Sequence, residues 1–406
     1  MFSYEEIKTI RKQFPIFKKK NIIYFDNAAT TQKPFKVINA ITKYYCNFNS
    51  NVKRSFHFLG QFSNNCLELS RNNIQAFINA KSREEIIFTS GTTESINLIA
   101  FCIEKLIKQY DNIIISHSEH HSNIIPWQVL SKNKNANLKV IPVNSEGELN
   151  IRIWNKLITK NKNTKLISIS HVTNTFGIIN PIKTLIKTAH KYNSLVLIDG
   201  SQAISHITID VQNLACDFYI FSSHKMYGPT GIGILYGKKK ILDKFPPYQC
   251  GGGMIEKVTL KKTIFSGLPF KLEAGTPNLA GIIGTNKAFN FLVNYSIRKI
   301  NTYETKLLKY ALKILSNIKG IKIYSNNYNI TNILSFNIEN INSFDLGKLL
   351  NTHGIAVRTG KHCAQPIMDS LKINGTIRIS FAIYNTIEEI DIFYNSLIKV
   401  LYYFNI

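Results

Sequence analysis

The feature that most constrains the fold is a regular alternation of short apolar runs with longer helical patterns. The runs are rich in β-branched residues and span residues 86–90, 112–116, 138–143, 165–170, 195–199, 217–222 and 232–236. In the segment after Gly60, ahead of the first run, apolar residues recur at helical spacing at Leu67, Ile74, Phe77 and Ile78, and longer helical patterns also separate the runs. Parallel strands need crossover helices, so this order is typical of an α/β domain. We predict seven strands in a mainly parallel sheet.

A second pattern begins near residue 297. It consists of a long helix, alternating segments at 321–324 and 333–338, a helix near 344–351 and a final strand–helix pair. At 406 residues the chain exceeds the roughly 250–300 residues at which one core stops growing. We therefore predict a large domain over 21–296 and a smaller α+β domain formed by 1–20 and 297–406, because the amphipathic first twenty residues can pack against the C-terminal part.

The net charge of +25 permits a nucleic-acid partner, since basic surfaces attract phosphates. However, the lysines are scattered among Asn and Ile residues and accompany no nucleic-acid-binding motif. We expect weak, nonspecific binding at most, and a basic nucleic-acid-binding protein stays the alternative from a different class.

The cysteines and the apolar stretches indicate the compartment. Six cysteines lie far apart without a C-x-x-C pair, so we expect reduced thiols and no metal site. The N-terminus lacks an apolar signal region, and the longest uncharged stretch, 166–182, is too polar to span a membrane. We expect a cytoplasmic protein without a membrane partner.

Polar residues follow three predicted strands, where ligands bind in open α/β sheets. Asp199 ends one strand, Lys225 follows a second, and a Gly91-Thr92-Thr93 turn opens a helix after a third. Taken singly, these are ordinary helix caps and solvated charges. Together, Asp199 and Lys225 offer the anion and the amine that pyridoxal phosphate requires, and a helix N-terminus can bind its phosphate.

Four motifs resemble the signatures of cysteine desulfurases with the class V aminotransferase fold. They are Asp199-Gly200-Ser201-Gln202, the segment 222–233 that contains Ser222-Ser223-His224-Lys225, Gly251-Gly252-Gly253-Met254-Ile255 and Glu273-Ala274-Gly275-Thr276-Pro277-Asn278. The resemblance extends from about Tyr24 to Arg378 and is closest to the SUF-type, group II branch. It implies a fold-type I pyridoxal-phosphate enzyme that forms a homodimer with shared active sites.

The implied reaction converts L-cysteine to L-alanine and transfers the sulfur as a persulfide. A SufE-like protein is the implied acceptor, with a SufBCD-type scaffold for iron–sulfur cluster assembly downstream. Selenocysteine lyase activity at the same site is the nearest alternative. Another fold-type I reaction, such as transamination, is a second alternative, for which a catalytic cysteine would be irrelevant.

The resemblance also implies residue roles. Lys225 would carry the cofactor as a Schiff base, Asp199 would pair with the ring nitrogen, Gln202 would bond the ring hydroxyl, and His121 would stack on the ring and assist proton transfers. The phosphate would be held by Thr92, Thr93, Ser222 and His224, and by Thr276 of the neighbouring subunit. The substrate carboxylate would be bound by Asn174, Arg358 and Arg378, although Arg378 could instead form a salt bridge within the C-terminal strand.

Cys363 would be the catalytic nucleophile. A free cysteine is most often a small buried hydrophobe, but Lys361 and His362 precede this one and would favour the thiolate. The resemblance places the persulfide-forming cysteine here, in the short loop typical of group II. Ser223, Lys361 and Lys53 stand where the family commonly has Gly, His and His. Because an unperturbed lysine does not titrate near neutrality, we expect Lys361 to alter the pH dependence.

Overall fold

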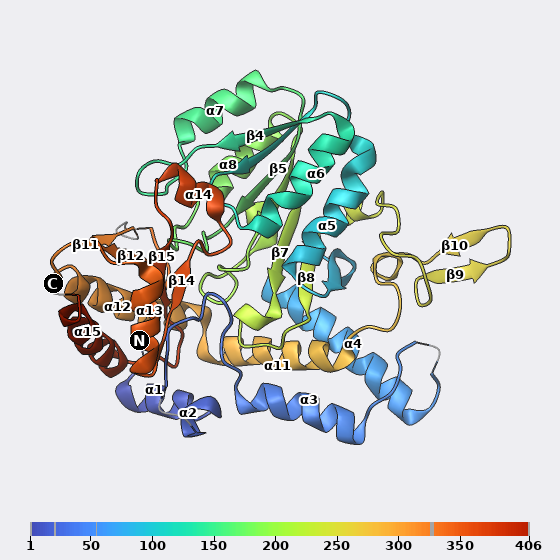
Figure 1. Cartoon of the computed structure of the whole chain (residues 1–406). Helices are drawn as coiled ribbons and strands as arrows, with labels where there is room; N and C mark the ends of the chain where they lie inside the picture. The colour runs from blue at the N-terminus through green and yellow to red at the C-terminus, as the bar shows by residue number, and fades with distance from the viewer. Residues whose placement is uncertain (1, 20–21, 54, 325–328, 405–406) are drawn as a thin grey trace.

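The computed structural model, which describes residues 2–19, 22–53, 55–324 and 329–404, has a seven-stranded sheet at its centre (Figure 1). In spatial order the strands are β2 (Ile86–Thr89), β8 (Gly233–Gly237), β7 (Phe218–Ser222), β6 (Leu195–Asp199), β5 (Thr164–Ser170), β3 (Asn112–Ser116) and β4 (Asn137–Ile141). The pairs from β7 to β4 are parallel, whereas β8 runs antiparallel to β2 and β7. The predicted mainly parallel sheet is confirmed.

Helices cover both faces of this sheet, which explains why its strands lack a polar side. In β3, for example, Ile113 and Ile115 belong to one apolar cluster and Ile114 to the other, because successive strand residues point to opposite faces. The first cluster includes side chains of α5 (Thr92–Ile103) and α6 (Ile125–Lys134), and the second those of α7 (Ile151–Lys160) and α8 (Ile182–His190).

Three long helices pack together beside the sheet (Figure 1). They are α3 (Phe35–Asn47), α4 (Phe58–Phe77) and α11 (Leu279–Tyr295). Leu67, Ile74 and Ile78 are buried in the core, as predicted from their spacing. A hairpin of β9 (Ile255–Val258) and β10 (Thr263–Phe265) projects from this side of the molecule (Figure 1). Short helices α9 (Val211–Leu214) and α10 (Lys239–Leu242) follow β6 and β8.

The C-terminal part forms a separate antiparallel sheet with its own helices. Its strands, in spatial order, are β11 (Ile321–Ile323), β12 (Ile333–Ile338), β15 (Thr376–Ser380) and β14 (Arg358–Gly360). Its helices are α12 (Ile297–Leu315), α13 (Ser343–Thr352), α14 (Gln365–Ser370) and α15 (Ile387–Tyr402). A capping box of Thr386 and Glu389 sets the start of α15. This unit has the α+β character predicted for the smaller domain.

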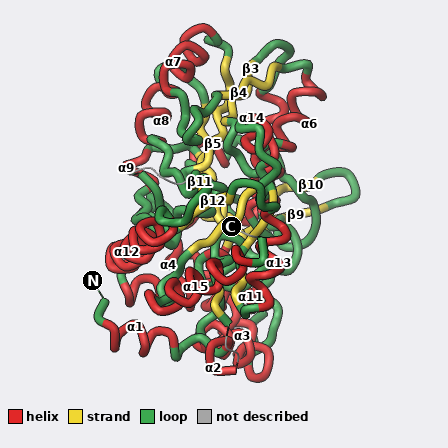
Figure 2. The backbone as a smooth tube through the Cα atoms, turned by 60° about the vertical axis from the view of Figure 1, so that its left-hand side comes forward, coloured by secondary structure: helices red, strands yellow, loops and turns green. Residues whose placement is uncertain are grey.

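The N-terminal arm lies against this smaller unit (Figure 2). It contains α1 (Tyr4–Arg11), α2 (Ile16–Lys19) and β1 (Ile23–Tyr24), which pairs in parallel with β13 (Ile355–Ala356). Arg11 forms a 2.7 Å ion pair with Glu389 of α15. The predicted boundary at residues 20–21 lies outside the described residues. Because β1 pairs with β13, we propose that the arm belongs to the smaller domain as far as Asp26.

Among the described residues, no helix combines the length and apolarity needed to cross a membrane. In the same part of the chain, no three His, Cys, Asp or Glu side chains lie together so that they could hold a metal ion.

Candidate active site

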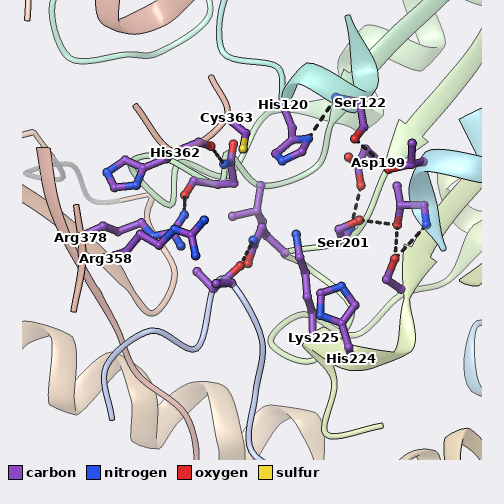
Figure 3. A pocket seen from close by; sticks show the side chains of 18 residues that line it. His120, Ser122, Asp199, Ser201, His224, Lys225, Arg358, His362, Cys363 and Arg378 are labelled. Carbon is purple, nitrogen blue, oxygen red and sulfur yellow. Dashed lines mark hydrogen bonds between the residues drawn. The ribbon is translucent and has the colours of Figure 1, made fainter. Parts of the chain in front are cut away.

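A cavity of about 270 Å³ at the carboxyl edge of the central sheet collects most of the predicted residues (Figure 3). Its lining includes Thr92, Thr93, Asn174, Asp199, Gln202, Ser222, His224, Lys225, Arg358, Cys363 and Arg378. These residues come from both domains. The cavity is therefore a product of the tertiary structure, and the predicted residues His121 and Thr276 do not line it.

Lys225 ends the short turn after β7, and its side chain points into the cavity (Figure 3). The backbone around it is held by other segments: the N–H of Thr31 donates to the His224 carbonyl at 3.0 Å, and Ser205 Oγ donates to the Lys225 carbonyl at 3.3 Å. Burial lowers the pKa of Lys225, against the attraction of Asp199. A lowered pKa increases the fraction of neutral amine, the form that attacks a carbonyl carbon.

Asp199, the last residue of β6, is buried at the cavity wall. The N–H of Ser201 donates to its Oδ1 at 2.9 Å, so the carboxylate is held by its own turn. Gln202 Nε2 donates to the Ala28 carbonyl at 2.7 Å, which ties this turn to the segment after β1.

A group of hydroxyls lies at the N-terminus of α5. The N–H of Thr92 donates to Ser222 Oγ at 2.8 Å, and Thr92 Oγ1 lies 2.9 Å from Ser201 Oγ. Thr93 Oγ1 lies 2.9 Å from Ser122 Oγ. Ser201 and Ser122 were not among the predicted site residues, although Ser201 lies inside the Asp199–Gln202 motif. Hydroxyl donors at a positive helix end suit an anion such as phosphate.

These donors fit pyridoxal phosphate as a set. The several hydroxyls at the N-terminus of α5 can bind the phosphate, and the Asp199 carboxylate can pair with a protonated ring nitrogen. The amine of Lys225 lines the same cavity. Burial lowers the pKa of His224 to about 4. This imidazole is therefore neutral at pH 7 and can still donate one N–H.

Arg358 and Arg378 lie side by side at the other end of the cavity (Figure 3). They are direct cross-strand partners in β14 and β15. Arg378 Nη1 donates to the Asn174 carbonyl at 2.7 Å, and its Nη2 lies 3.4 Å from Asp26 Oδ1. Arg358 Nη1 lies 3.6 Å from Asp26 Oδ2. Burial lowers the pKa of Arg378 to about 10, although Asp26 opposes the shift. Paired guanidinium groups suit a carboxylate ligand.

Cys363 lies on the loop between β14 and α14, exposed at the cavity mouth. Both His362 and Cys363 have positive φ angles, of 52° and 54°, a conformation rarely adopted by residues other than glycine. Two hydrogen bonds hold this backbone conformation: Asn174 Nδ2 donates to the His362 carbonyl and the N–H of His121 donates to the Cys363 carbonyl, both at 2.7 Å. Backbone strain of this kind clusters at functional sites.

The charges around the thiol differ from the expectation. His362 is buried, and burial lowers the pKa of its imidazole. It is therefore neutral at pH 7 and supplies no positive charge to Cys363, contrary to the expectation. Lys361 Nζ lies 3.5 Å from Asp369. Positive charge in the cavity comes instead from Arg358 and Arg378.

The two adjacent histidines face different sides. His120 lines the cavity, whereas His121 lines a neighbouring apolar pocket and its Nε2 accepts from the N–H of Gln365 at 3.1 Å. Burial lowers the pKa of His120 to about 3. We therefore propose that His120, one residue before the predicted position, is the histidine that would contact a ring bound in the cavity. The EHH motif itself did not distinguish the two.

Thr276 lies in a separate pocket of its own chain, with Lys53 and Glu273. Its predicted contact with a neighbouring subunit stays a prediction. The departures from the family pattern are accommodated locally: Ser223 Oγ lies 2.8 Å from Thr285 Oγ1, and Lys53 Nζ donates to the Gly253 carbonyl at 2.6 Å.

Comparisons with known proteins agree with this fold. Residues 23–393 match the family model of aminotransferase class V. A Wigglesworthia glossinidia brevipalpis protein named cysteine desulfurase is 48% identical over 401 residues, which cover 97% of each chain. A cysteine desulfurase structure from Thermococcus onnurineus NA1 has a TM-score of 0.94 and 35% identity over 98% of each chain. The Escherichia coli cysteine desulfurase CsdA structure has a TM-score of 0.92 and 34% identity over 99% of each chain. The fold is that of fold-type I pyridoxal-phosphate enzymes, and the chain belongs to the class V aminotransferase family.

Proposed function

We propose that this chain is a pyridoxal-phosphate-dependent cysteine desulfurase that converts L-cysteine to L-alanine and keeps the sulfur as a persulfide on Cys363. One observation carries the proposal: Lys225, the arginine pair and the Cys363 thiol all line one cavity. A transaminase needs the first two features but has no use for the exposed thiol.

The cofactor would be held by residues already described. Lys225 would bond it covalently, Asp199 would contact the ring nitrogen, Gln202 the ring hydroxyl and His120 the ring face. The phosphate would be bound by Thr92, Thr93, Ser222 and His224, with Thr276 of a second subunit. When bound, pyridoxal phosphate supplies an aldehyde for the substrate amine and a ring that accepts electrons from Cα.

The residues of the chain would carry out the remaining steps. Asn174, Arg358 and Arg378 would orient the substrate carboxylate, and the neutral amine of Lys225 would take the Cα proton. The Cys363 thiolate would then attack the substrate sulfur, forming an S–S bond as the C–S bond breaks. The carbon skeleton takes up a proton and leaves as alanine, so that a thiol and cysteine become a persulfide and alanine.

The sulfur acceptor would be a SufE-like protein, with a SufBCD-type scaffold for iron–sulfur clusters downstream. The loop between β14 and α14 supports this SUF-type, group II assignment, because residues 361–364 are too few to carry Cys363 far from the cavity. An acceptor must therefore approach the exposed thiol. The same amine and carboxylate contacts would hold selenocysteine, so we propose selenocysteine lyase activity as well.

A homodimer would complete the site. Thr276 lies outside the cavity of its own chain, and large apolar side chains are exposed on the β9–β10 hairpin, such as Val258 at 59% and Ile264 at 43%. Sedimentation velocity of the purified protein tests this assembly, and a monomer that retains full activity would contradict it.

Cys363→Ser tests the proposed chemistry. Because cofactor and substrate binding need no protein thiol, this variant should bind pyridoxal phosphate and change its absorption spectrum when cysteine is added. Alanine formation should collapse, since a serine hydroxyl is scarcely ionised at neutral pH. Cys250→Ser, which alters another exposed cysteine, is the matched control. Wild-type alanine release by Cys363→Ser, or no added sulfur on Cys363 by mass spectrometry, would refute the proposal.

A further inference from the structure

We propose that Asp26 is a positioning residue that holds Arg358 and Arg378 together as one carboxylate-binding pair. The inference deepens the proposed function and rests on it, because it takes the two arginines as the receptor for the substrate carboxylate. Asp26 lies two residues after β1, far in sequence from both arginines.

The two arginines repel each other in the arrangement that the strands impose. Arg358 and Arg378 are directly opposite on antiparallel strands, where like charges are destabilising. The Arg378 side chain is only 3% exposed and cannot turn to water, whereas that of Arg358 is 45% exposed and can. Without a counter-charge, Arg358 should therefore swing toward solvent and leave the pair.

Asp26 supplies that counter-charge with separate oxygens. Its Oδ1 lies 3.4 Å from Arg378 Nη2 and its Oδ2 lies 3.6 Å from Arg358 Nη1. Asp26 does not belong to the described residues that line the cavity. It therefore contacts the two arginines on the side away from the cavity and leaves the substrate position free. Two positive groups and one negative group leave one net positive charge, which matches a single carboxylate.

The backbone fixes Asp26 in this position. It forms a parallel bridge with Ser380, two residues beyond Arg378, and its carbonyl accepts from the N–H groups of Ala29 at 3.1 Å and Thr30 at 3.3 Å. The next residue, Thr31, donates its N–H to the His224 carbonyl. One short segment therefore contacts both the arginine pair and the turn that carries Lys225, and it sets the spacing between them.

Burial is consistent with this arrangement. It raises the pKa of Asp26, and the two arginines act in the opposite direction. The arginines thus favour the charged carboxylate that in turn holds them in place.

Asp26→Asn is the test, because asparagine keeps the size of the side chain and removes the charge. We expect the KM for L-cysteine to rise about tenfold, the scale of one charge-assisted hydrogen bond, with a smaller change in kcat. Asp26→Glu restores the charge and should recover part of the loss. Asp345→Asn, at an exposed aspartate on α13 of the same domain, is the matched control and should leave KM unchanged.

A measurement without turnover separates this role from general damage. Urea unfolding of the Asp26→Asn, Arg358→Gln and double variants should show coupling: the Asp26 change should cost less once Arg358 has lost its charge. If Asp26→Asn does not fold alone, the double variant decides, because it removes one of the two facing positive charges and should fold where the single variant does not; failure of both to fold would also overturn the inference. An unchanged KM in Asp26→Asn, or additive unfolding energies, would overturn the inference. A wild type that releases no alanine from cysteine refutes the proposed function instead, and the unfolding cycle still tests Asp26.

Discussion

Replacing Glu273 with glutamine should destabilise the chain by about 3–5 kcal/mol, because it leaves a buried guanidinium without its counter-charge. Arg71 of α4 is fully buried, and its Nη1 and Nη2 bind the two Glu273 oxygens at 2.8 and 2.9 Å. Glu273 Oε1 also accepts from the N–H of Phe88 at 2.8 Å. The ion pair therefore connects α4, through Arg71, and β2, through Phe88, to the Glu273–Asn278 segment that carries Thr276.

The magnitude follows from burial. Glu68, the other carboxylate near Arg71, lies 3.9 Å from Nε and is 30% exposed, so water screens it. It cannot replace Glu273. Against a total stability of roughly 5–15 kcal/mol, losing 3–5 kcal/mol should lower the urea midpoint clearly. Loosening the segment should also weaken retention of pyridoxal phosphate if Thr276 reaches a second subunit.

The assay is urea unfolding monitored by circular dichroism. It compares the wild type with Arg71→Met, Glu273→Gln and the double variant. The double variant should be less destabilised than the sum of the two single variants, because it buries no unpaired charge. Glu68→Gln is the control and should cost less than about 1 kcal/mol. A loss below about 1 kcal/mol for Glu273→Gln, or additive losses, would show that the pair contributes little and that this reasoning is wrong.

Three further results are expected. Burial lowers the pKa of Lys33 from 10.5 to about 7, so the unfolded chain binds more protons than the folded chain between these pH values. The free energy of unfolding should therefore rise with pH in this range. In urea titrations at several pH values, Lys33→Met should show a smaller rise. His120→Gln should change the absorption spectrum of the bound cofactor more than His121→Gln, because only His120 lines the cavity; the reverse order would return the role to His121. Burial raises the pKa of Cys102 to about 12 and also raises that of Cys216. Iodoacetamide should therefore label both only after unfolding, whereas folded protein should be labelled at the exposed cysteines Cys46, Cys250 and Cys363, as peptide mapping will show.

Much of the fold and site could be predicted from local patterns. Each of the strands β2 to β8 overlaps one of the apolar runs recognised in the sequence, although some of their ends differ by one or two residues, because a strand buried on both faces needs a continuous apolar segment. Asp199 and Lys225 could be placed at the cavity for a similar reason: each follows a strand, and the carboxyl ends of neighbouring parallel strands share one edge of the sheet.

The choice between adjacent side chains depended on long-range contacts. Whether His120 or His121 faces the cavity is set by the hydrogen bonds of His121 to Cys363 and Gln365, more than two hundred residues away. The charge state of His362 likewise depends on its burial, and Asn174, almost two hundred residues away, holds its backbone carbonyl. Neither contact leaves a periodic signal in the sequence.

The sequence by itself determined the order of strands and helices, because this depends on side-chain type and local periodicity. Its motifs, through their resemblance to a family, also indicated Lys225 and Cys363 as the proposed central groups. Only the tertiary structure decided which histidine meets the cavity, that Asp26 contacts both arginines and that Arg71 pairs with Glu273. Those contacts join segments distant in the chain, and their energies depend on burial and distance, which exist only after the two domains have packed together.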